Sequence, residues 1–521
     1  ERRNEERQHR EGKTAYSSCT ALPRWALLSK GEKTPSLPPK MWGLGRFFCI
    51  FVLKDNIQRC KMKLYFIGIG GIGMSALVRY FLSKGDQVAG YDLTPSPLID
   101  ALVQEGASVH FEDDPQSIPT AFRSPDVLVV YTPAVPQDHK ELCFFREQGN
   151  RVIKRAELLG ELTRRERGLC VAGTHGKTTT STLLAHLLRQ SHVDCHAFLG
   201  GISNNYKTNL LLSEHSDYAV IEADEFDCSF HHLSPFIAII TSADPDHLDI
   251  YHTAEAYRES FEYFSSLISP EGALVMKKGI PMTPRLQSGT RLYTYALEDK
   301  EADFRATDIH VAEGKLFFTW HYPALEGRPA GQLRVELGVP LLVNVENAVA
   351  AMAVAFLVGA TEEELQAGVS SFRGVHRRFD RVIDTPQCVL IDDYAHHPHE
   401  LAPSIRSVKE LYPGRHILGV FQPHLYSRTQ DFYREFAEAL DTLDEVILLD
   451  IYPARELPIP GVTSELIAGE MHRAKVQVLS KAELLPFLKE QSKLPEVILM
   501  VGAGDIDRLV PQVAEWIRTK L

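Results

Sequence analysis

The sequence predicts an α/β protein of three domains, each built on a parallel sheet with helices on both faces. Short β-branched runs at 127–133, 169–175, 218–224 and 236–244 alternate with helical stretches after Met62, as is typical of parallel sheets. Glycine-rich turns follow strands at three well separated places, Gly68, Gly173 and Gly502, which indicates three sheets and not one. The length of 521 residues also fits three domains, at about 150 residues each.

The expected domains differ in type. We predict a Rossmann-like nucleotide-binding domain at 62–155, a central P-loop ATPase-like domain at 156–376 and a Rossmann-like C-terminal domain at 377–521. Strand-like alternation over 300–340 predicts a small antiparallel insert in the central domain.

Composition excludes several classes of protein. The chain is 44% hydrophobic and 24% charged, which rules out a fibrous or wholly disordered protein. Its net charge of −12 argues against nucleic-acid binding, and no run reaches the roughly 18 apolar residues of a membrane span. Eight cysteines with no C-x-x-C pair favour a reducing compartment over disulfides or structural zinc. We therefore expect a cytoplasmic protein without stable membrane association.

Residues 1–61 differ from the rest of the chain. They carry 13 Lys and Arg against 6 Asp and Glu and show no helical or strand periodicity. The apolar run 47–53 ends in Lys54 and Asp55 and not in a cleavage site, so a signal peptide is a poor interpretation. We expect a disordered or non-native leader, with folding from Met62; a basic membrane-surface or targeting arm is the alternative.

The first glycine loop predicts a diphosphate site. Gly68, Gly70 and Gly73 satisfy G-x-G-x-x-G between a strand and a helix, with Gly71 inside the loop. Glycines there allow backbone amides at a helix N-terminus to approach a diphosphate, and Asp92 after the next strand stands where an acid binds a ribose hydroxyl. The pattern alone leaves NAD, another nucleotide diphosphate and mere strand–helix packing open.

The second loop predicts a triphosphate site. Gly173 to Thr180 reads GTHGKTTT at a strand-to-helix turn, where backbone amides wrap phosphates, Lys177 contacts the terminal phosphates and Thr178 binds Mg²⁺. Val171 stands where the usual pattern has its first glycine.

Acidic residues after two later strands are candidate magnesium ligands. Glu222 and Asp224 end one strand, and Asp244, Asp246 and His247 follow the next. Ligands collect at such strand ends, and the clustered acids would repel one another without a cation. A solvated loop with a structural His247 is the alternative.

Eight motifs, in this order, resemble the Mur ligase family: GTHGKTTT, EADEFD, DPDHLDIYH, NVENA, GVHRRFD, DDYAHHP, FQPHLYSRT and PIPG. The resemblance covers roughly 62–521 and implies an ATP-dependent amide ligase of peptidoglycan precursor synthesis. It is strongest to the members that join L-alanine to the carboxylate of UDP-N-acetylmuramate. It also implies that the first loop holds UDP and not NAD.

The resemblance assigns roles residue by residue. It implies that Thr178 and Glu222 hold one Mg²⁺ and that His247 holds a second. Catalytic roles fall on Lys177, His247, His396 and Arg428. ATP contacts are implied for Gly173, Thr174, His175, Gly176, Lys177, Thr178, Thr179, Asn344, Asn347 and Arg378. Contacts to the other substrates are implied for Gly68, Gly70, Gly71, Gly73, Asp92, Thr132, Tyr394, His397, His424 and Tyr426.

Three positions depart from the family pattern. Leu425 stands where many relatives have arginine, so one cationic contact to substrate is missing or supplied elsewhere. Val343 replaces a frequent histidine beside Asn344. Glu262 stands near the position of the carbamylated lysine of sister ligases, so we expect no such modification.

The implied reaction converts the sugar carboxylate to an acyl phosphate, which the alanine amine attacks, releasing ADP and phosphate. A base must deprotonate the amine because amines are largely protonated near pH 7, and His396 is a candidate. The alternatives are a ligase that recycles a tripeptide onto the same sugar, an NAD-dependent oxidoreductase and a nucleotide-gated binding protein. We expect a monomer or weak homodimer.

Overall fold

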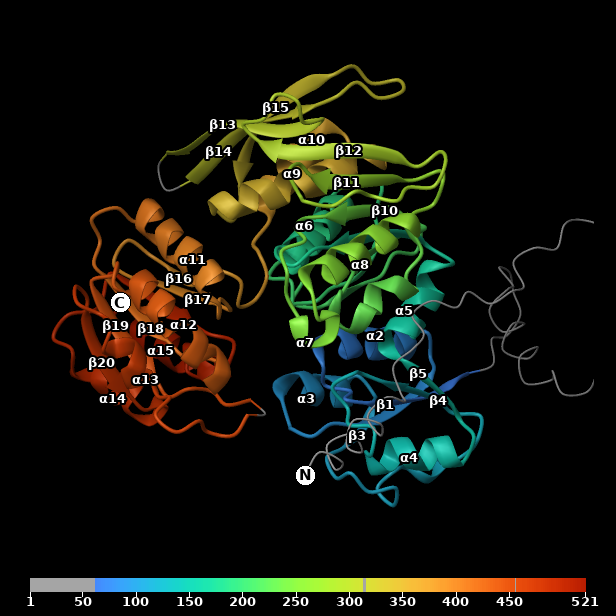
Figure 1. Ribbon diagram of the computed structural model, residues 1–521, viewed down its shortest axis with the longest axis horizontal. Coiled ribbons are helices and arrows are strands. Elements are labelled where there is room, and N and C mark those ends of the chain that lie inside the picture. The colour runs from blue at the N-terminus through green and yellow to red at the C-terminus, as the bar shows by residue number, and fades with distance from the viewer. Residues whose placement is uncertain (1–60, 313–314, 455) are drawn as a thin grey trace, which may run out of the picture. The chain divides into compact units, whose positions relative to one another are not determined.

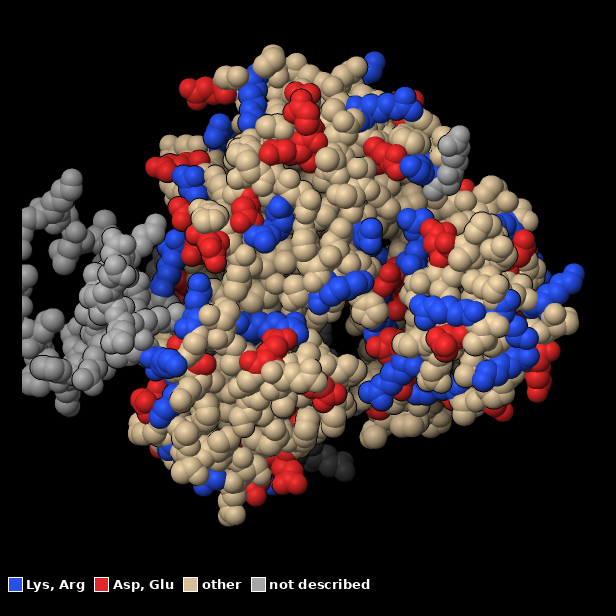
Figure 2. All heavy atoms as spheres, turned by 180° about the vertical axis from the view of Figure 1, so that it is seen from behind, with Lys and Arg blue, Asp and Glu red and all other residues tan. Residues whose placement is uncertain are grey.

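A computed structural model describes residues 61–312, 315–454 and 456–521 (Figure 1). The predicted leader therefore lies, except for Lys61, outside the described residues. Lys61–Leu521 form one compact unit that contains three sheets. No helix in the described ranges is long and apolar enough to cross a membrane. Figure 2 shows acidic and basic side chains interspersed over one face of the protein.

The N-terminal sheet is parallel and has the strand order β3-β2-β1-β4-β5. Its buried strands carry β-branched and aromatic residues on both faces, as expected of a sheet covered by helices. The strands are β1 (Lys63–Ile67), β2 (Gln87–Tyr91), β3 (Ser108–His110), β4 (Leu128–Tyr131) and β5 (Arg151–Lys154). The helices are α2 (Ile72–Ser83), α3 (Pro97–Gln104) and α4 (Lys140–Glu147).

The central sheet has ten strands in the order β15-β14-β13-β12-β11-β10-β6-β9-β7-β8. Its strands are β6 (Arg167–Ala172), β7 (His196–Phe198), β8 (Leu210–Leu211), β9 (Tyr218–Glu222), β10 (Pro235–Ile240), β11 (Ala273–Lys277), β12 (Arg291–Leu297), β13 (Phe304–Ala312), β14 (Lys315–Tyr322) and β15 (Gly331–Leu337). Its helices are α5 (Arg155–Thr163), α6 (Lys177–Arg189), α7 (Leu248–Tyr251), α8 (Ala254–Ser266), α9 (Leu342–Leu357) and α10 (Glu362–Ser371).

The predicted antiparallel insert is present, but it is continuous with the central sheet. β13, β14 and β15 pair antiparallel, and β13 pairs parallel with β12. The insert therefore extends one edge of the parallel sheet and makes it mixed. Backbone hydrogen bonding explains this continuity, because the edge of β12 offers unpaired groups that β13 satisfies.

The C-terminal sheet has the order β16-β17-β21-β18-β19-β20, and only β16 runs antiparallel to its neighbour. The strands are β16 (Asp380–Asp384), β17 (Val389–Asp393), β18 (Ile417–Phe421), β19 (Glu445–Leu449), β20 (Lys475–Leu479) and β21 (Val497–Val501). The helices are α11 (Pro398–Leu411), α12 (Tyr426–Leu440), α13 (Ser464–Ala468), α14 (Lys481–Glu490) and α15 (Val510–Arg518).

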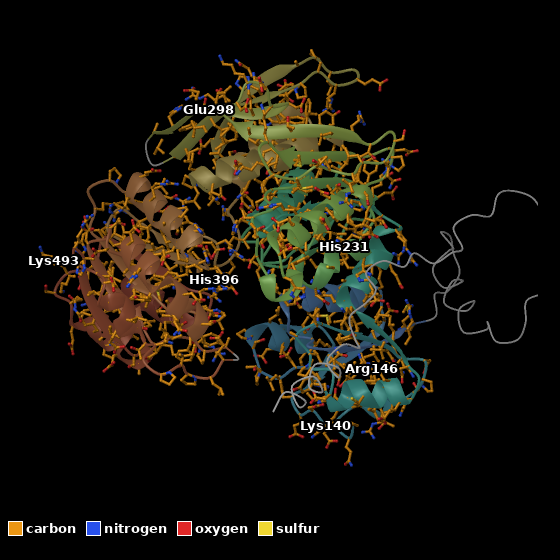
Figure 3. The ribbon with its side chains drawn as sticks, viewed as in Figure 1. Lys140, Arg146, His231, Glu298, His396 and Lys493 are labelled. Carbon is orange, nitrogen blue, oxygen red and sulfur yellow. The ribbon has the colours of Figure 1, made fainter. Side chains whose placement is uncertain are left out.

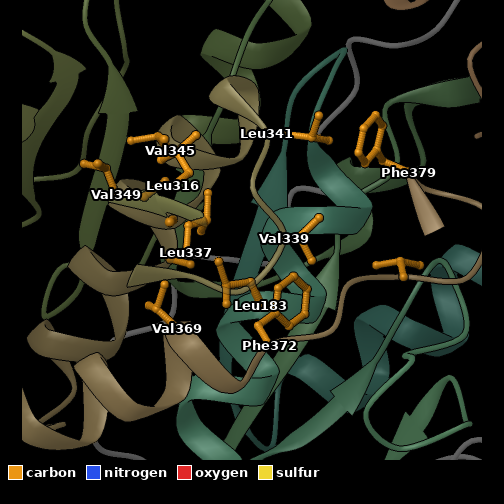
Figure 4. Close-up of a cluster of buried hydrophobic side chains, with 14 of the residues drawn as sticks. Leu183, Leu316, Leu337, Val339, Leu341, Val345, Val349, Val369, Phe372 and Phe379 are labelled. Atoms are coloured by element: carbon orange, nitrogen blue, oxygen red, sulfur yellow. The ribbon is translucent and has the colours of Figure 1, made fainter. Parts of the chain in front are cut away.

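The three glycine turns follow β1, β6 and β21, which lie in three different sheets, so the prediction of three α/β units is confirmed. The domain boundaries themselves stay predictions. Helix α9 is apolar almost all round and is buried accordingly. In Figure 4 its Val345 and Val349 lie with Leu316 of β14, Leu337 of β15 and Leu183 of α6, the helix that follows the second glycine loop.

Candidate active site

The second glycine loop joins β6 to α6 and is held in a tight conformation. Gly173 and Gly176 have φ values of 138° and 80°, which glycine adopts most easily. A Cβ on Gly176 would lie 2.7 Å from Asn347 Oδ1, and one on Gly173 would collide with Thr241. The amide of His175 donates to Ser242 Oγ (2.9 Å). The loop is therefore fixed by neighbours on both sides.

Lys177 begins α6, and its ammonium group is held inside the loop. Nζ donates to Gly173 O (2.6 Å) and pairs with Glu225 Oε1 at 2.8 Å. Burial lowers the pKa of Lys177, but the nearby Glu225 carboxylate outweighs this and keeps the pKa above its usual value. Burial raises the pKa of Glu225 to about 7, against the opposing charge of Lys177. A cation is thus kept where phosphates would lie.

Thr178 and Glu222 form the second part of the site. Thr178 Oγ1 donates to Glu222 Oε1 (3.1 Å), and Glu222 is the last residue of β9. The other carboxylate oxygen, Oε2, is buried without a hydrogen-bond partner. Burial raises the pKa of Glu222, and the charge of Lys177 opposes the shift. A hydroxyl and an unpartnered carboxylate oxygen are thus brought together, as hard-cation sites require.

The loop of Asp244, Asp246 and His247 is largely open to solvent. The side chains of Asp244 and Asp246 are 70% and 54% exposed, so water screens the repulsion between them. The predicted role of His247 as a metal ligand stays a prediction. His247 has a φ of 52° and packs edge-on against Phe226. In the described part of the chain, no three His, Cys, Asp or Glu side chains gather as a metal cluster.

Asn347 of α9 contacts the glycine-loop segment and a second asparagine of the same helix, Asn344. Asn347 Oδ1 accepts from Thr180 Oγ1 (3.1 Å), and Asn347 Nδ2 donates to Asn344 Oδ1 (3.1 Å). Thr174 Oγ1 lies on the other side of the loop and donates to Asp244 O (2.7 Å). Both asparagines are buried; Asn347 therefore helps to hold the loop, and Asn344 holds Asn347.

Arginine and tyrosine side chains stack where the C-terminal sheet begins. The guanidinium groups of Arg377 and Arg378 lie 5.0 and 4.8 Å from the ring centroid of Tyr394. Asp393 accepts from the Phe379 amide (3.1 Å) and from Ser404 Oγ (2.6 Å). Asp393 and Tyr394 of the DDY motif thus hold the segment 377–379, which leads into the C-terminal sheet.

His396, labelled in Figure 3, has ring contacts with Tyr394 and His424. Its Nδ1 is 3.0 Å from Tyr394 O and 3.4 Å from Glu400 Oε2, and its ring meets that of His424 edge-on. Burial lowers the pKa of His396 and the charge of Arg428 adds to this, while Glu400 opposes it. The ring is therefore neutral at pH 7, with Nδ1 carrying its proton toward the two oxygens.

The remaining C-terminal candidates lie on two helices. His397 caps α11 by accepting from the His399 amide (3.3 Å), and Tyr426 begins α12. Arg428, in the first turn of α12, has a buried Nη1 without a hydrogen-bond partner. Leu425, the departure noted above, precedes α12 with a φ of 71°.

The first glycine loop joins β1 to α2, as predicted. Asp92 Oδ2 accepts from the Gly70 amide (2.8 Å), so this acid holds the loop in addition to any ligand contact. A cavity beside the loop is lined by Gly71, Gly73 and Thr132 on one side and by Glu222 on the other. Gly68 and Gly70 do not line it.

Family models match almost all of the described chain. The Mur ligase family catalytic domain matches 63–167, the middle domain 171–355 and the glutamate ligase domain 377–504. The UDP-N-acetylmuramate–L-alanine ligase of Porphyromonas gingivalis is 64% identical over 459 residues, 88% of this chain and 99% of that protein. The chain belongs to the Mur ligase family.

One further sequence and two solved structures are also similar to this Mur ligase. The ligase of the same name from Parabacteroides distasonis is 59% identical and aligns over 87% of this chain and 96% of its own. The crystal structure of the UDP-N-acetylmuramate–alanine ligase of Thermotoga maritima has a TM-score of 0.75 at 28% identity and covers 88% of this chain and 100% of its own. A murein peptide ligase of Psychrobacter arcticus, at 22% identity, shares the fold with a TM-score of 0.61 over 87% of this chain and 98% of its own.

Most of the ATP residues expected of a Mur ligase line one cavity. It is lined by Thr174, His175, Gly176, Lys177, Thr178, Thr179, Glu222, Asn344, Asn347 and Arg378. Gly173, His247, His396, Arg428, Tyr394, His397, His424 and Tyr426 do not line it. Glu222 lines both this cavity and the one beside the first loop, which makes it their junction.

Sequence reasoning missed two acids. Glu225 lies inside the EADEFD motif, and that position was the only signal in the sequence. Nothing in the spacing of the motif indicates that Glu225 pairs with Lys177. Glu400 also lines the cavity beside the second loop. It lies in the first turn of α11, where its carboxylate accepts a hydrogen bond from the backbone amide of His396, which precedes the helix (3.1 Å).

Proposed function

We propose that the chain is an ATP-dependent ligase that joins L-alanine to the carboxylate of UDP-N-acetylmuramate. The carboxylate attacks the γ-phosphate of ATP, and the alanine amine then displaces phosphate from the acyl phosphate. One observation carries the proposal. Lys177 and Thr178 line the cavity beside the second glycine loop, and Glu222, which pairs with Thr178, also lines the cavity beside the first loop. The names of relatives 59–64% identical to the chain support the same activity.

Phosphoryl transfer depends mainly on positioning and charge neutralisation. Lys177 is held at the loop by Gly173 O and Glu225, so its ammonium group needs little reorganisation before it contacts terminal phosphates. Backbone amides of the loop and of the first turn of α6 are available to the same phosphates.

The residues present fit a magnesium ion. The buried, unpartnered Glu222 Oε2 and the Thr178 hydroxyl offer two oxygen ligands, and Mg²⁺ usually takes its other ligands from water and phosphates. Bound there, Mg²⁺ would neutralise negative charge on the transferring phosphoryl group. His247 is the proposed ligand of a second ion, as the family resemblance implies.

His396 is the base we propose for the amine. Its ring is neutral because burial lowers its pKa, and its Nδ1 faces Tyr394 O and Glu400. Nε2 is therefore the nitrogen left to accept the ammonium proton of alanine. The unpartnered Nη1 of Arg428 offers a donor for the alanine carboxylate.

We also propose that the ligase works in the cytoplasm as a monomer or weak homodimer. The described cysteines Cys143, Cys170, Cys195, Cys228 and Cys388 are all free, which fits a reducing compartment. Sedimentation at micromolar concentrations tests the oligomeric state.

Isotope transfer tests the reaction. UDP-N-acetylmuramate labelled with ¹⁸O in its carboxylate should pass one labelled oxygen to inorganic phosphate for each amide bond formed, with ADP as the other product. Label in AMP would contradict an acyl phosphate. Replacing L-alanine with an L-alanine-headed tripeptide should give much slower turnover; equal or faster turnover would favour the tripeptide-recycling ligase.

A further inference from the structure

The cavity beside the first glycine loop contains a charge arrangement that the function above does not use. Among the described residues that line it, Arg155 is the sole Lys or Arg, while Glu222 and Asp224 contribute carboxylates. On the proposed function, a sugar nucleotide with a diphosphate and a carboxylate must lie here. Without Arg155 the charged side chains of this cavity would all repel that substrate.

Arg155 occupies the ligand-binding edge of the N-terminal sheet. It is the first residue of α5 and directly follows β5, so it lies at the same carboxyl edge as the loop after β1 and Thr132 after β4. Ligands of open parallel sheets bind at this edge. Strand β5 therefore sets the position of Arg155, because no loop separates the strand from this residue.

The guanidinium of Arg155 is fixed between the first loop and the central sheet. Nη2 donates to Asp224 Oδ2 (3.1 Å), and Nη1 lies so close to Gly73 that a Cβ there would collide with it. The side chain is 20% exposed. The third glycine of G-x-G-x-x-G therefore makes room for a cation in this chain, beyond any role in helix packing.

We propose that Arg155 binds the diphosphate of the UDP-sugar and that Asp224 orients its guanidinium for this contact. The inference rests on the proposed function, because it assumes that the first loop holds UDP. We assign the diphosphate and not the sugar carboxylate, because Nη1 lies at the N-terminal turn of α2, whose amides face the same anion. A planar guanidinium suits two phosphate oxygens at once.

The test measures ligand binding by calorimetry with three ligands: UDP alone, UDP-N-acetylglucosamine and UDP-N-acetylmuramate. Arg155→Met should weaken all three by a similar factor, about 10- to 100-fold, since all share the diphosphate. Arg155→Lys should recover part of the loss. Arg151→Met is the control, because Arg151 pairs with Glu161 on the surface of the same strand–helix unit and should change affinity less than twofold.

Gly73→Ala offers an independent variant that should fold. Gly73 lies in α2 without a positive φ, so alanine suits the helix, but its Cβ would displace the Arg155 side chain. Gly73→Ala should weaken UDP binding, and the double variant with Arg155→Met should be no weaker than Arg155→Met alone within a factor of three. Additive losses would mean that Gly73 acts without Arg155.

The outcomes separate this inference from the proposed function. Wild-type protein that neither binds UDP-N-acetylmuramate nor ligates alanine overturns the proposed function. Wild-type protein that does both, with Arg155→Met unchanged for UDP, overturns the role of Arg155. A loss confined to UDP-N-acetylmuramate overturns the diphosphate assignment and moves the contact to the sugar carboxylate.

Discussion

At the scale of single residues, Lys177 is both the proposed contact of the ATP phosphates and the partner of the buried Glu225 carboxylate. Lys177→Met should abolish turnover, because the terminal phosphates lose their cation, while UDP binding stays within threefold of wild type, since the two glycine loops lie on different sheets. Kinetics and calorimetry measure the two effects. Lys489→Met, on the exposed face of α14, is the control. A collapse of UDP affinity would show that the loops are assigned to the wrong ligands.

The same variant should change how stability depends on pH. The folded-state pKa of Glu225, about 7, lies above its usual 4.5, so the free energy of unfolding falls as pH rises between these values. Lys177 lowers the pKa of Glu225, so removing Lys177 raises this pKa and extends the fall to higher pH. Lys177→Met should therefore be destabilised more at pH 8 than at pH 6, by on the order of 1–2 kcal/mol. Urea unfolding of both proteins at the two pH values measures it, and an equal difference at both would contradict the coupling.

Glu222 supports a prediction about metal dependence. Glu222→Gln replaces one charged oxygen ligand with a neutral amide, so half-maximal activity should need about tenfold more Mg²⁺. Initial rates against Mg²⁺ concentration at saturating ATP give the value. Glu214→Gln, an exposed change in the same domain, should leave the Mg²⁺ curve unmoved. An unmoved curve for Glu222→Gln would place the ion elsewhere.

At the scale of elements, α9 holds the phosphate loop through Asn347. Asn347→Ala removes the acceptor of Thr180 Oγ1 and the wall against Gly176, so KM for ATP should rise about tenfold with a loss of about 1–2 kcal/mol in stability. The control is Glu346→Ala on the same helix. It breaks an ion pair with Lys277 of β11 and should leave KM for ATP unchanged. A loss of stability with KM for ATP unchanged would contradict the role of Asn347 in ATP binding and leave α9 a role in packing only.

Site residues could be predicted from the sequence where they lie directly after a strand. The glycine loop marks Lys177 directly, and an apolar run marks Glu222 at the end of β9. Both residues line the cavity beside the second glycine loop. Glu225 and Asp224 were visible in a motif, but their partners Lys177 and Arg155 are 48 and 69 residues away. No local pattern encodes such pairs. Lys177 and Glu225 meet because β6 and β9 are neighbours in the central sheet, whereas Arg155 and Asp224 meet because two different sheets pack together. The insert's continuity with the central sheet was missed because the pairing of β12 with β13 is likewise a tertiary choice.

At the scale of the whole molecule, Asn209 ties the first loop's helix to the central sheet. It is fully buried just before β8; its Nδ2 donates to Ile72 O (2.6 Å) and Ser75 Oγ (2.9 Å), and its Oδ1 accepts from Arg79 (2.6 Å). A side chain with this many satisfied groups fixes α2, and with it the proposed UDP-sugar site, relative to the second glycine loop.

Asn209→Ala should therefore lower kcat more than tenfold while UDP affinity stays near wild type, because misplacement of reacting groups costs rate and not nucleotide binding. Steady-state kinetics and calorimetry separate the two quantities, with unfolding midpoints as a check on the fold. Glu105→Gln, which removes the surface partner of Arg79, is the matched control. Full activity in a folded Asn209→Ala protein would show that other contacts set the spacing.

Glu222 borders both cavities, and this has a consequence for inhibition. A molecule with a uridine diphosphate group at one end and a phosphate mimic of ATP at the other could pass this residue and occupy both cavities together. Once one end is bound, the other meets its cavity at an effective concentration in the millimolar range for a short linker. Two weak halves would then make one tight inhibitor, provided the linker spans the carboxylate of Glu222 without displacing it.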